Sequence, residues 1–195
     1  MTGVRSLGTR LIGCPVFMMK WKLLIILAAA LTAALSLIPL HVLKIDTVKE
    51  ERPVLVRTVR AGDEFLLGYI HSVELSPVWD YFRIDESYRI VLYETTFQSL
   101  NTGLPSTLAG DERLIREGDH FRISGMNRSL PFIELQVQAR TDNTLVVGGV
   151  ESFKLHALAG DTLLRIRIHK THIWGYLYLK AKQAEVSKSI EKKSG

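Results

Sequence analysis

The chain has 195 residues, enough for one ordinary domain with an appendage, and a formal net charge of +5 at pH 7. The positive charge lies at the ends, because residues 1–40 carry +4 and residues 180–195 carry +3, whereas residues 41–179 carry −2. A nucleic-acid-binding domain concentrates basic residues on its folded body, so nucleic acid is excluded as a partner. The single cysteine, Cys14, excludes an intramolecular disulfide framework.

An uncharged apolar stretch begins at Leu23 and ends at Leu40. As an α-helix it would be roughly 27 Å long, close to the thickness of the hydrocarbon core of a bilayer. Lys20 and Lys22 precede it, so the positive-inside rule predicts a cytoplasmic N-terminus and an exported remainder. We therefore predict a basic cytoplasmic leader over residues 1–22, a single membrane-spanning segment over residues 23–43, and a periplasmic or extracytoplasmic domain at a bacterial inner membrane.

Two properties of the N-terminal region stay open. Ala34 and Ser36 are small residues at the positions that a signal peptidase reads, but the apolar run continues beyond them, so we favour an uncleaved anchor over a signal peptide. Residues 1–17 are either a short leader or the result of a start codon placed too early, since Met18 and Met19 open a compact basic start for an exported protein.

The rest of the chain lacks the helical period and alternates short strand-like runs with turn signals. The predicted strands are residues 54–59, 65–70, 78–84, 88–97, 121–123, 133–138, 145–147, 153–155, 162–169 and 173–179. This pattern predicts an all-β domain over residues 44–180, an antiparallel sandwich or a barrel-like fold. Residues 41–52 are expected to lead the chain off the membrane, residues 111–119 to form a loop, and residues 181–195 to form a flexible Lys-rich tail.

Three of the predicted strands carry more specific expectations. Residues 65–70 are apolar on both faces, which is typical of a central strand that is covered on both sides. Residues 78–84 and 88–97 flank the turn signal Asp85-Glu86-Ser87, so they are expected to form a hairpin.

The first candidate site is His71, Ser72 and Glu74, at the end of the predicted central strand. His71 and Glu74 suit ligand or partner recognition, or an acid–base pair or metal ligands in an enzyme, although polar side chains that end a strand before Pro77 also have a purely structural explanation. Ser72 is a poor nucleophile for His71, because neighbouring strand residues point to opposite faces. A catalytic triad would need a partner from elsewhere in the chain.

The second candidate site is the segment that contains Gln98, Asn101, Gly103, Leu104 and Pro105. Gly103 permits a positive φ and Pro105 fixes its own φ, so a sharp corner between sheets is the simpler interpretation. The alternative is a loop whose backbone N–H groups, with Gln98 and Asn101, bind a small anion or a carboxylate.

The other histidines of the body do not form a metal-binding pattern. His169 and His172 are three residues apart, a spacing that suits a helix, but their region is predicted to be strand and turn. We predict neither a metal site nor a cofactor.

Several short blocks of the sequence form a recognisable combination. They are Phe65 and Tyr69 with His71-Ser72-Val73-Glu74, then Ser76-Pro77-Val78, and Phe97-Gln98-Ser99 leading to Gly103-Leu104-Pro105. In this combination the chain resembles the DUF1850 family of uncharacterised bacterial proteins. One departure is Asn101-Thr102-Gly103, where family members tend to have a Gly-Ala-Gly type of sequence. The resemblance implies an exported or membrane-anchored domain of unknown activity that is associated with TAXI-type TRAP solute transporters.

Together these observations predict a non-catalytic accessory domain that contacts a TRAP permease or solute-binding protein around His71 and Gly103. An envelope hydrolase or metal-dependent enzyme that uses His71 and Glu74 is one alternative. A structural or assembly protein of the cell envelope is the other.

Overall fold

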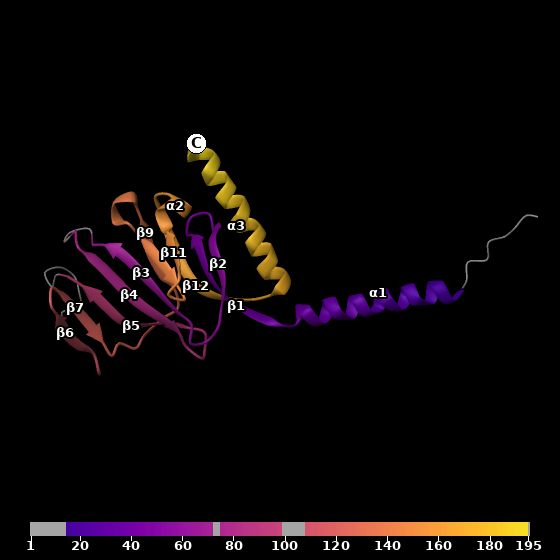
Figure 1. Cartoon of the computed structure of the whole chain (residues 1–195), viewed down its shortest axis with the longest axis horizontal. Coiled ribbons are helices and arrows are strands. Elements are labelled where there is room, and N and C mark those ends of the chain that lie inside the picture. The colour runs from indigo at the N-terminus through magenta and orange to yellow at the C-terminus, as the bar shows by residue number, and fades with distance from the viewer. Residues whose placement is uncertain (1–14, 72–74, 99–107, 195) are drawn as a thin grey trace, which may run out of the picture. The chain divides into compact units, whose positions relative to one another are not determined.

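The computed structural model describes residues 15–71, 75–98 and 108–194 of the chain (Figure 1). The chain divides into two compact units, residues 1–38 and residues 39–195. In the first unit, the helix α1 (Pro15–Ser36) has an apolar window, Met19–Ser36, that is long enough to cross a membrane and has no part buried. A helix with these properties near the N-terminus suits a membrane anchor or a signal sequence.

The apolar helix ends earlier than the segment predicted to span the membrane. Residues 39–43, which were predicted to belong to that segment, lie in the first strand of the second unit. Pro39 opens that strand, and proline suits the position because it lacks the N–H that a continuing helix requires.

The second unit is a sandwich of two antiparallel sheets. Sheet A has the strand order β2-β1-β12-β9 and consists of β1 (Pro39–Thr47), β2 (Pro53–Val59), β9 (Ile133–Val137) and β12 (Thr162–His172). Sheet B has the order β11-β10-β3-β4-β5-β7-β6, with β8 paired to β5. Its strands are β3 (Glu64–Ile70), β4 (Pro77–Ile84), β5 (Ile90–Phe97), β6 (Arg113–Glu117), β7 (His120–Ser124), β8 (Arg128–Leu130), β10 (Thr144–Val147) and β11 (Glu151–Lys154).

This architecture confirms the predicted all-β antiparallel sandwich. Within the described ranges neither sheet closes on itself, so the barrel-like alternative is not adopted. The predicted hairpin is confirmed because β4 pairs with β5, and β3 has its predicted central position between β10 and β4. The predicted coverage of β3 on both faces is not found, since Leu66 and Ile70 are only partly buried.

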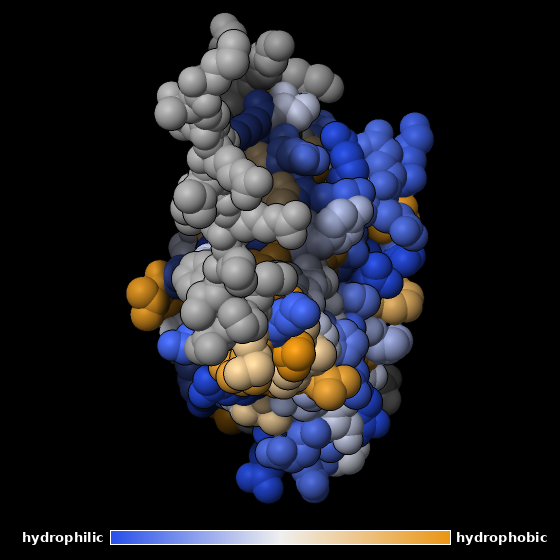
Figure 2. Space-filling model, turned by 90° about the vertical axis from the view of Figure 1, so that its right-hand side faces the viewer, coloured by the Kyte–Doolittle hydropathy of each residue, from blue (hydrophilic) through white to orange (hydrophobic). Residues whose placement is uncertain are grey.

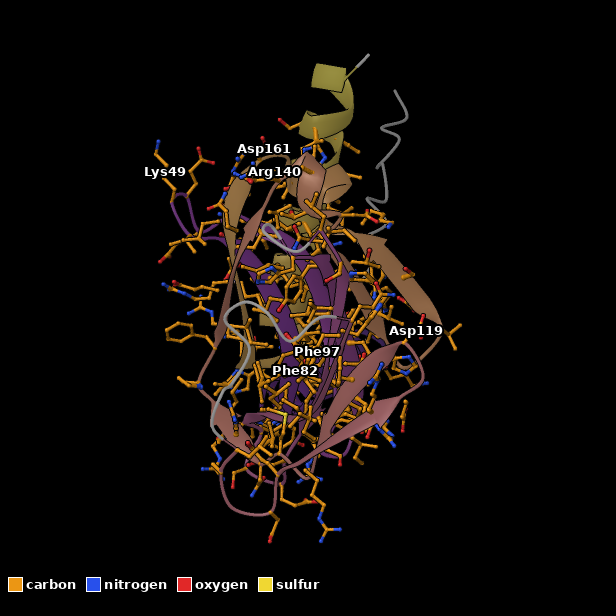
Figure 3. All side chains as sticks on the ribbon, turned by 90° about the vertical axis from the view of Figure 1, so that its left-hand side faces the viewer. Lys49, Phe82, Phe97, Asp119, Arg140 and Asp161 are labelled. Atoms are coloured by element: carbon orange, nitrogen blue, oxygen red, sulfur yellow. The ribbon has the colours of Figure 1, made fainter. Side chains whose placement is uncertain are left out.

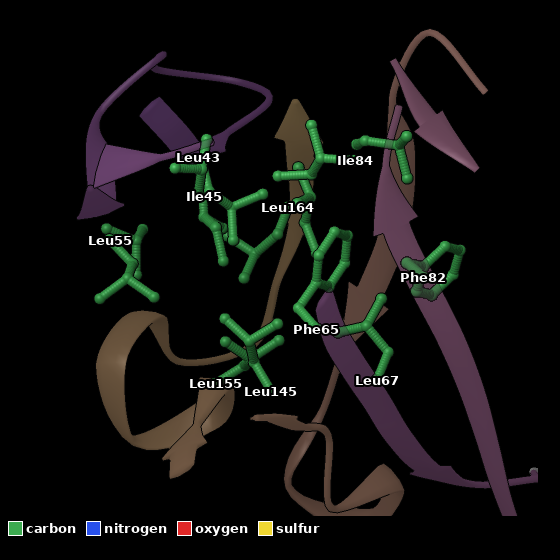
Figure 4. Packing of buried hydrophobic residues seen from close by; sticks show 14 of the residues in the cluster. Leu43, Ile45, Leu55, Phe65, Leu67, Phe82, Ile84, Leu145, Leu155 and Leu164 are labelled. Carbon is green, nitrogen blue, oxygen red and sulfur yellow. The ribbon is translucent and has the colours of Figure 1, made fainter. Parts of the chain in front are cut away.

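The core forms where the inner faces of the two sheets meet (Figure 4). Sheet A contributes Leu43, Ile45 and Leu164, and sheet B contributes Phe65 and Phe82, whose rings stack with centroids 5.0 Å apart. Burying each of these side chains stabilises the fold by about 1.5–3 kcal/mol. A second cluster, Val78, Phe97, Ile123 and Met126, comes from sheet B and the segment that follows β7. On the face that Figure 2 shows, the coloured surface is mostly hydrophilic, with separate apolar patches in orange.

The helix α3 (Ile173–Ser194) packs against β2, β1 and β12 of sheet A. The side-chain oxygen of Gln183 accepts a hydrogen bond from the N–H of Val56 (3.0 Å), and the ammonium of Lys180 donates to the carbonyl of Val56 (3.4 Å). Because β2 is an edge strand of sheet A, these bonds satisfy backbone groups that would otherwise be available to another chain.

Helix α3 corrects two expectations. The prediction of a strand over residues 173–179 is wrong because β12 ends at His172, and the structure continues α3 through Ser194 where a flexible tail was expected. The packing of Gly175 on Thr171 lets the helix start directly after the strand, since a Cβ at position 175 would collide with the Thr171 hydroxyl.

Three further segments differ from the prediction. Residues 41–47 belong to β1, which lies between β2 and β12, rather than to a lead off the membrane. The predicted loop over residues 111–119 contains β6. The short helices η1 (Ala139–Thr141) and α2 (Leu155–Ala159) lie in connections, and α2 shortens the strand predicted over residues 153–155.

Candidate functional site

The candidate site lies at the end of sheet B where β3 ends and β4 begins. The register pairs Ile70 with Pro77, Val78 with Phe97, and Phe97 with Phe121. This pairing places the residues that follow β3 and β5 at the same end of the sheet as the start of β7. We call this region, defined by His71, Leu75, Pro77, Gln98 and His120, the distal end.

Two of the predicted site residues, His71 and Gln98, lie at the distal end. His71 follows β3 and Gln98 follows β5, with β4 between them, so their backbones are separated by two strand spacings, roughly 10 Å. The other predicted site residues, Ser72, Glu74, Asn101, Gly103, Leu104 and Pro105, lie outside the described residues. The pairing of His71 with Glu74 therefore stays a prediction.

Backbone hydrogen bonds define the turn that follows β3. The N–H of His71 donates to the carbonyl of Ser76, and the carbonyl of His71 accepts from the N–H of Leu75, both at 2.9 Å. Leu75 adopts a φ of 53°, in the left-handed region, and its side chain is 77% exposed. Since non-glycine residues rarely adopt this conformation, and leucine gains nothing from water, the turn displays an apolar side chain at a conformational cost.

A small pocket lies beside this turn. Its volume is about 230 Å³, and its lining residues are Pro77, Trp79, Thr96, Phe97, Gln98 and His120. The Trp79 ring forms one wall and lies over Gly68, where an added Cβ would come within 2.6 Å of the ring. The volume is below that of a typical small-molecule site, so the pocket suits a side chain of a protein partner better than a metabolite.

His120 is held at the pocket by two carboxylates of the β6–β7 hairpin. Its ring nitrogens lie 3.2 Å from Asp119 Oδ1 and 3.5 Å from Glu117 Oε2. The hydrogen bond with His120 lowers the pKa of Asp119. In Figure 3, Asp119 projects at the surface, whereas Phe82 and Phe97 lie inside the sandwich.

On the inner face of sheet B, the sequence analysis missed an acid. The hydroxyl of Thr95 donates a 2.5 Å hydrogen bond to Asp80 Oδ1, among the apolar residues of the second cluster. Burial raises the pKa of the Asp80 carboxyl, although the bond from Thr95 opposes this shift. Burial and the charge of Asp80 raise the pKa of the nearby Tyr69 hydroxyl. The available signal was the position of Asp80 in β4, which shares its face with Val78 and Phe82.

A larger cleft, of about 860 Å³, lies where β3 starts. Pro39, His41, Arg60, Asp63 and Tyr88 are among its lining residues, and the rings of His41 and Tyr88 stack at a centroid distance of 3.4 Å. Burial, with a smaller effect from the charge of Lys170, lowers the pKa of His41. The lining of this cleft is more polar than that of the pocket at the distal end. The cleft includes Pro39, the residue at which the second unit begins.

The remaining histidines do not join the distal end. His156 pairs with Asp161 at 2.9 Å, beside α2, and His169 lies on β12 of sheet A, where burial lowers its pKa. Within residues 15–71, 75–98 and 108–194, no group of three or more His, Cys, Asp or Glu side chains is arranged to hold a metal ion. The described part of the distal end presents the imidazoles of His71 and His120 together with aromatic, amide and apolar groups.

Comparison with known proteins gives one match. No curated protein and no solved structure matches the chain. Residues 65–153, from β3 to β11 and including both His71 and Gln98, match the model of a family described as a domain of unknown function (DUF1850), and this match supports the family resemblance over that part of the chain.

Proposed function

We propose that the chain is a membrane-tethered, non-catalytic accessory domain of a TAXI-type TRAP solute transporter in a bacterial inner membrane. In this role, the distal end binds the periplasmic solute-binding protein of the transporter. The observation that carries the proposal is the turn at Leu75 beside the apolar pocket, since an exposed apolar side chain next to a small aromatic-walled cavity is typical of protein recognition.

The position of the distal end favours a periplasmic partner over the permease. Pro39, the first residue after the N-terminal unit, lines the same cleft as Asp63, which precedes β3. Strand β3 then runs from Glu64 to Ile70, which carries the chain roughly 20 Å from that cleft. The distal end is thus separated from the point of attachment by the length of a strand, which leaves room for a partner in the periplasm.

The transporter itself enters the proposal through the family resemblance. The motif His71-Ser72-Val73-Glu74, with Phe97-Gln98-Ser99, lies inside the matched range and borders the distal end. The resemblance associates such domains with solute uptake, and the apolar helix α1 supplies a suitable tether.

Site-specific photo-crosslinking tests the proposal. A photoreactive amino acid replaces Gln98 or Leu75 in the tagged full chain, expressed in its own cells, and replaces Ser87 as a control. Ser87 is exposed and adjoins Tyr88, which lines the cleft at the other end of β3. We expect positions 98 and 75, but not 87, to crosslink to a solute-binding protein, and deletion of the chain to lower solute uptake. The proposal fails if no transporter component crosslinks and uptake survives the deletion.

A further inference from the structure

The first turns of α3 carry large exposed side chains on one face. Trp174, Leu177 and Tyr178 are 50%, 48% and 58% exposed. Their spacing of three and four residues places them together on the helix surface. The opposite face contains Lys180 and Gln183, which bond to Val56 of β2, so sheet A does not cover the exposed residues. We call Trp174, Leu177 and Tyr178 the aromatic face of α3.

The covalent chain keeps this face near the end of the apolar helix. In the β1–β12 pair, Pro39 is the partner of His172, and α3 begins at the next residue, Ile173. Only Leu37 and Ile38 separate Pro39 from Ser36, the last residue of α1. Three residue steps span at most about 11 Å. A bilayer that contains α1 therefore ends within a short distance of the start of α3.

The composition of the face matches the interfacial region of a bilayer. Trp and Tyr concentrate where a ring can bury its apolar body and keep its polar group in water. An exposed lysine, Lys182, adjoins the face, and its ammonium lies 5.1 Å from the centre of the Tyr178 ring. The first turn of α3 contains no acidic residue. This combination attracts the phosphates of anionic lipids.

We propose that the aromatic face of α3 is a membrane-contact surface, which lies in the headgroup region of the leaflet where α1 ends, with Lys182 at anionic lipid phosphates. The inference rests on the membrane tether that is part of the proposed function. Contact through this face fixes the orientation of the domain on the bilayer, which the two-residue link alone does not.

Depth measurements on the full chain test this proposal. Cys14 is replaced by serine, and a nitroxide is attached to a new cysteine at Ala181→Cys, on the same side of α3 as Trp174 and Tyr178. Ser189→Cys, eight residues further along the helix and about 12 Å away, is the matched control. Both are exposed in the structure. The protein is reconstituted at less than one copy per vesicle, in phosphatidylcholine with or without phosphatidylglycerol, and the collision rates of each nitroxide with oxygen and a water-soluble nickel chelate are compared.

We expect the label at position 181 to meet oxygen more often and the nickel chelate several-fold less often than the label at position 189, most strongly with phosphatidylglycerol. The triple variant Trp174→Gln, Leu177→Gln, Tyr178→Gln should make both labels equally accessible to nickel, with an unchanged circular dichroism spectrum. If the variant unfolds, Lys182→Gln serves instead and should reduce the effect of phosphatidylglycerol.

The contrary outcomes identify other occupants. Equal accessibility of the two labels in vesicles overturns the proposal. Protection of position 181 in native membranes, but not in vesicles that contain no other protein, assigns the face to a protein partner. Protection that appears only at several copies per vesicle assigns the face to a second copy of the chain. Alkaline extraction separates the two levels of inference: release of the chain from membranes refutes the tether, whereas a retained chain with a water-exposed label at 181 refutes the lipid contact alone.

Discussion

The two ends of the β domain both expose apolar side chains, but they present them differently. At the end where Pro39 pairs with His172, the aromatic face of α3 is exposed and adjoins Lys182. At the distal end, Leu75 stands on a constrained turn beside a pocket whose Trp79 wall is packed on Gly68. A lipid headgroup region has no fixed shape to match. A protein partner, in contrast, binds more tightly to a cavity of complementary shape with a central apolar anchor.

This contrast shows how a small domain can separate attachment from recognition. The surface proposed for lipid is defined by composition and needs little precision. The surface proposed for protein depends on close packing, so substitutions in its supporting residues should damage it most.

The largest effect is expected from Gly68→Val. A Cβ at this position would meet the Trp79 ring at 2.6 Å, so the ring must leave its place over β3 and the wall of the pocket is lost. Overpacking of this kind destabilises a protein by about 1–3 kcal/mol. Urea unfolding of the full chain in detergent measures the loss, and crosslinking from position 98 should disappear.

Gly175→Ala is the matched control at the other end of the domain. Its Cβ meets the Thr171 hydroxyl, which can rotate away, so the loss of stability should be smaller and crosslinking from position 98 should persist. Equal losses in the two variants would contradict the idea that the distal end depends more strongly on packing.

The next effect is expected from Gln183→Ala, which removes the acceptor for the Val56 N–H. An unsatisfied, poorly solvated backbone donor costs roughly 1–2 kcal/mol, and the attachment of α3 to β2 weakens. Amide hydrogen exchange at Val56 should accelerate while exchange at Phe65, in the core, changes little. Gln136→Ala on the exposed side of β9 is the control. If exchange at Val56 accelerates equally in this control variant, the role assigned to Gln183 is contradicted.

Asp80→Asn should change the pH dependence of stability. Burial raises the pKa of Asp80 in the folded state. At pH values between the ordinary pKa of an aspartate in the unfolded chain and this raised pKa, the folded protein therefore binds more protons than the unfolded chain. Wild-type stability therefore falls as pH rises from the ordinary pKa through the raised folded value. Asparagine has no charge to lose and can still accept the bond from Thr95, so the variant should exceed the wild type in Tm at pH 7 and match it near pH 4.

Thermal unfolding at both pH values checks this expectation. Asp63→Asn, on an exposed turn, is the control and should shift Tm little at pH 7. A wild-type Tm that rises between pH 4 and pH 7 relative to Asp80→Asn would contradict the assigned direction.

The smallest change in stability is expected from Leu75→Gly. Glycine adopts the positive φ of this turn without the penalty that leucine pays, and we expect a gain of about 0.5–1 kcal/mol. Partner crosslinking from position 98 should fall because the apolar anchor is gone. A variant that is more stable and still crosslinks fully would show that Leu75 is not part of the recognition surface.

Much of sheet B could be predicted from the sequence because its information is local. Alternation and the turn at Asp85 were sufficient to predict the β4–β5 hairpin, and the two apolar faces of β3 marked it as central. The antiparallel pairing of these strands then places the ends of β3 and β5, and hence His71 and Gln98, together.

Strand β1 and helix α3 could not be predicted because distant residues decide their structure. Lys44 and Asp46 look like parts of a polar linker, yet both are buried in β1, where Asp46 bonds to Lys44 at 2.8 Å and to Arg167, 121 residues away, at 3.1 Å. Residues 173–179 are apolar enough for a strand, but they form the start of a helix that packs against sheet A. Asp80 escaped notice because its burial depends on the packing around β4.

The pairing of β1 on both sides has a mechanical consequence. Helix α1 is joined to the domain at Pro39, the first residue of β1. Strand β1 is hydrogen-bonded to β12 on one side and to β2 on the other, so a load that arrives through α1 acts on both pairings. A pull along the strand must shear two ladders at once, whereas an edge strand would expose one. The segment that leaves α1 is therefore joined to an interior strand of sheet A rather than to an edge strand.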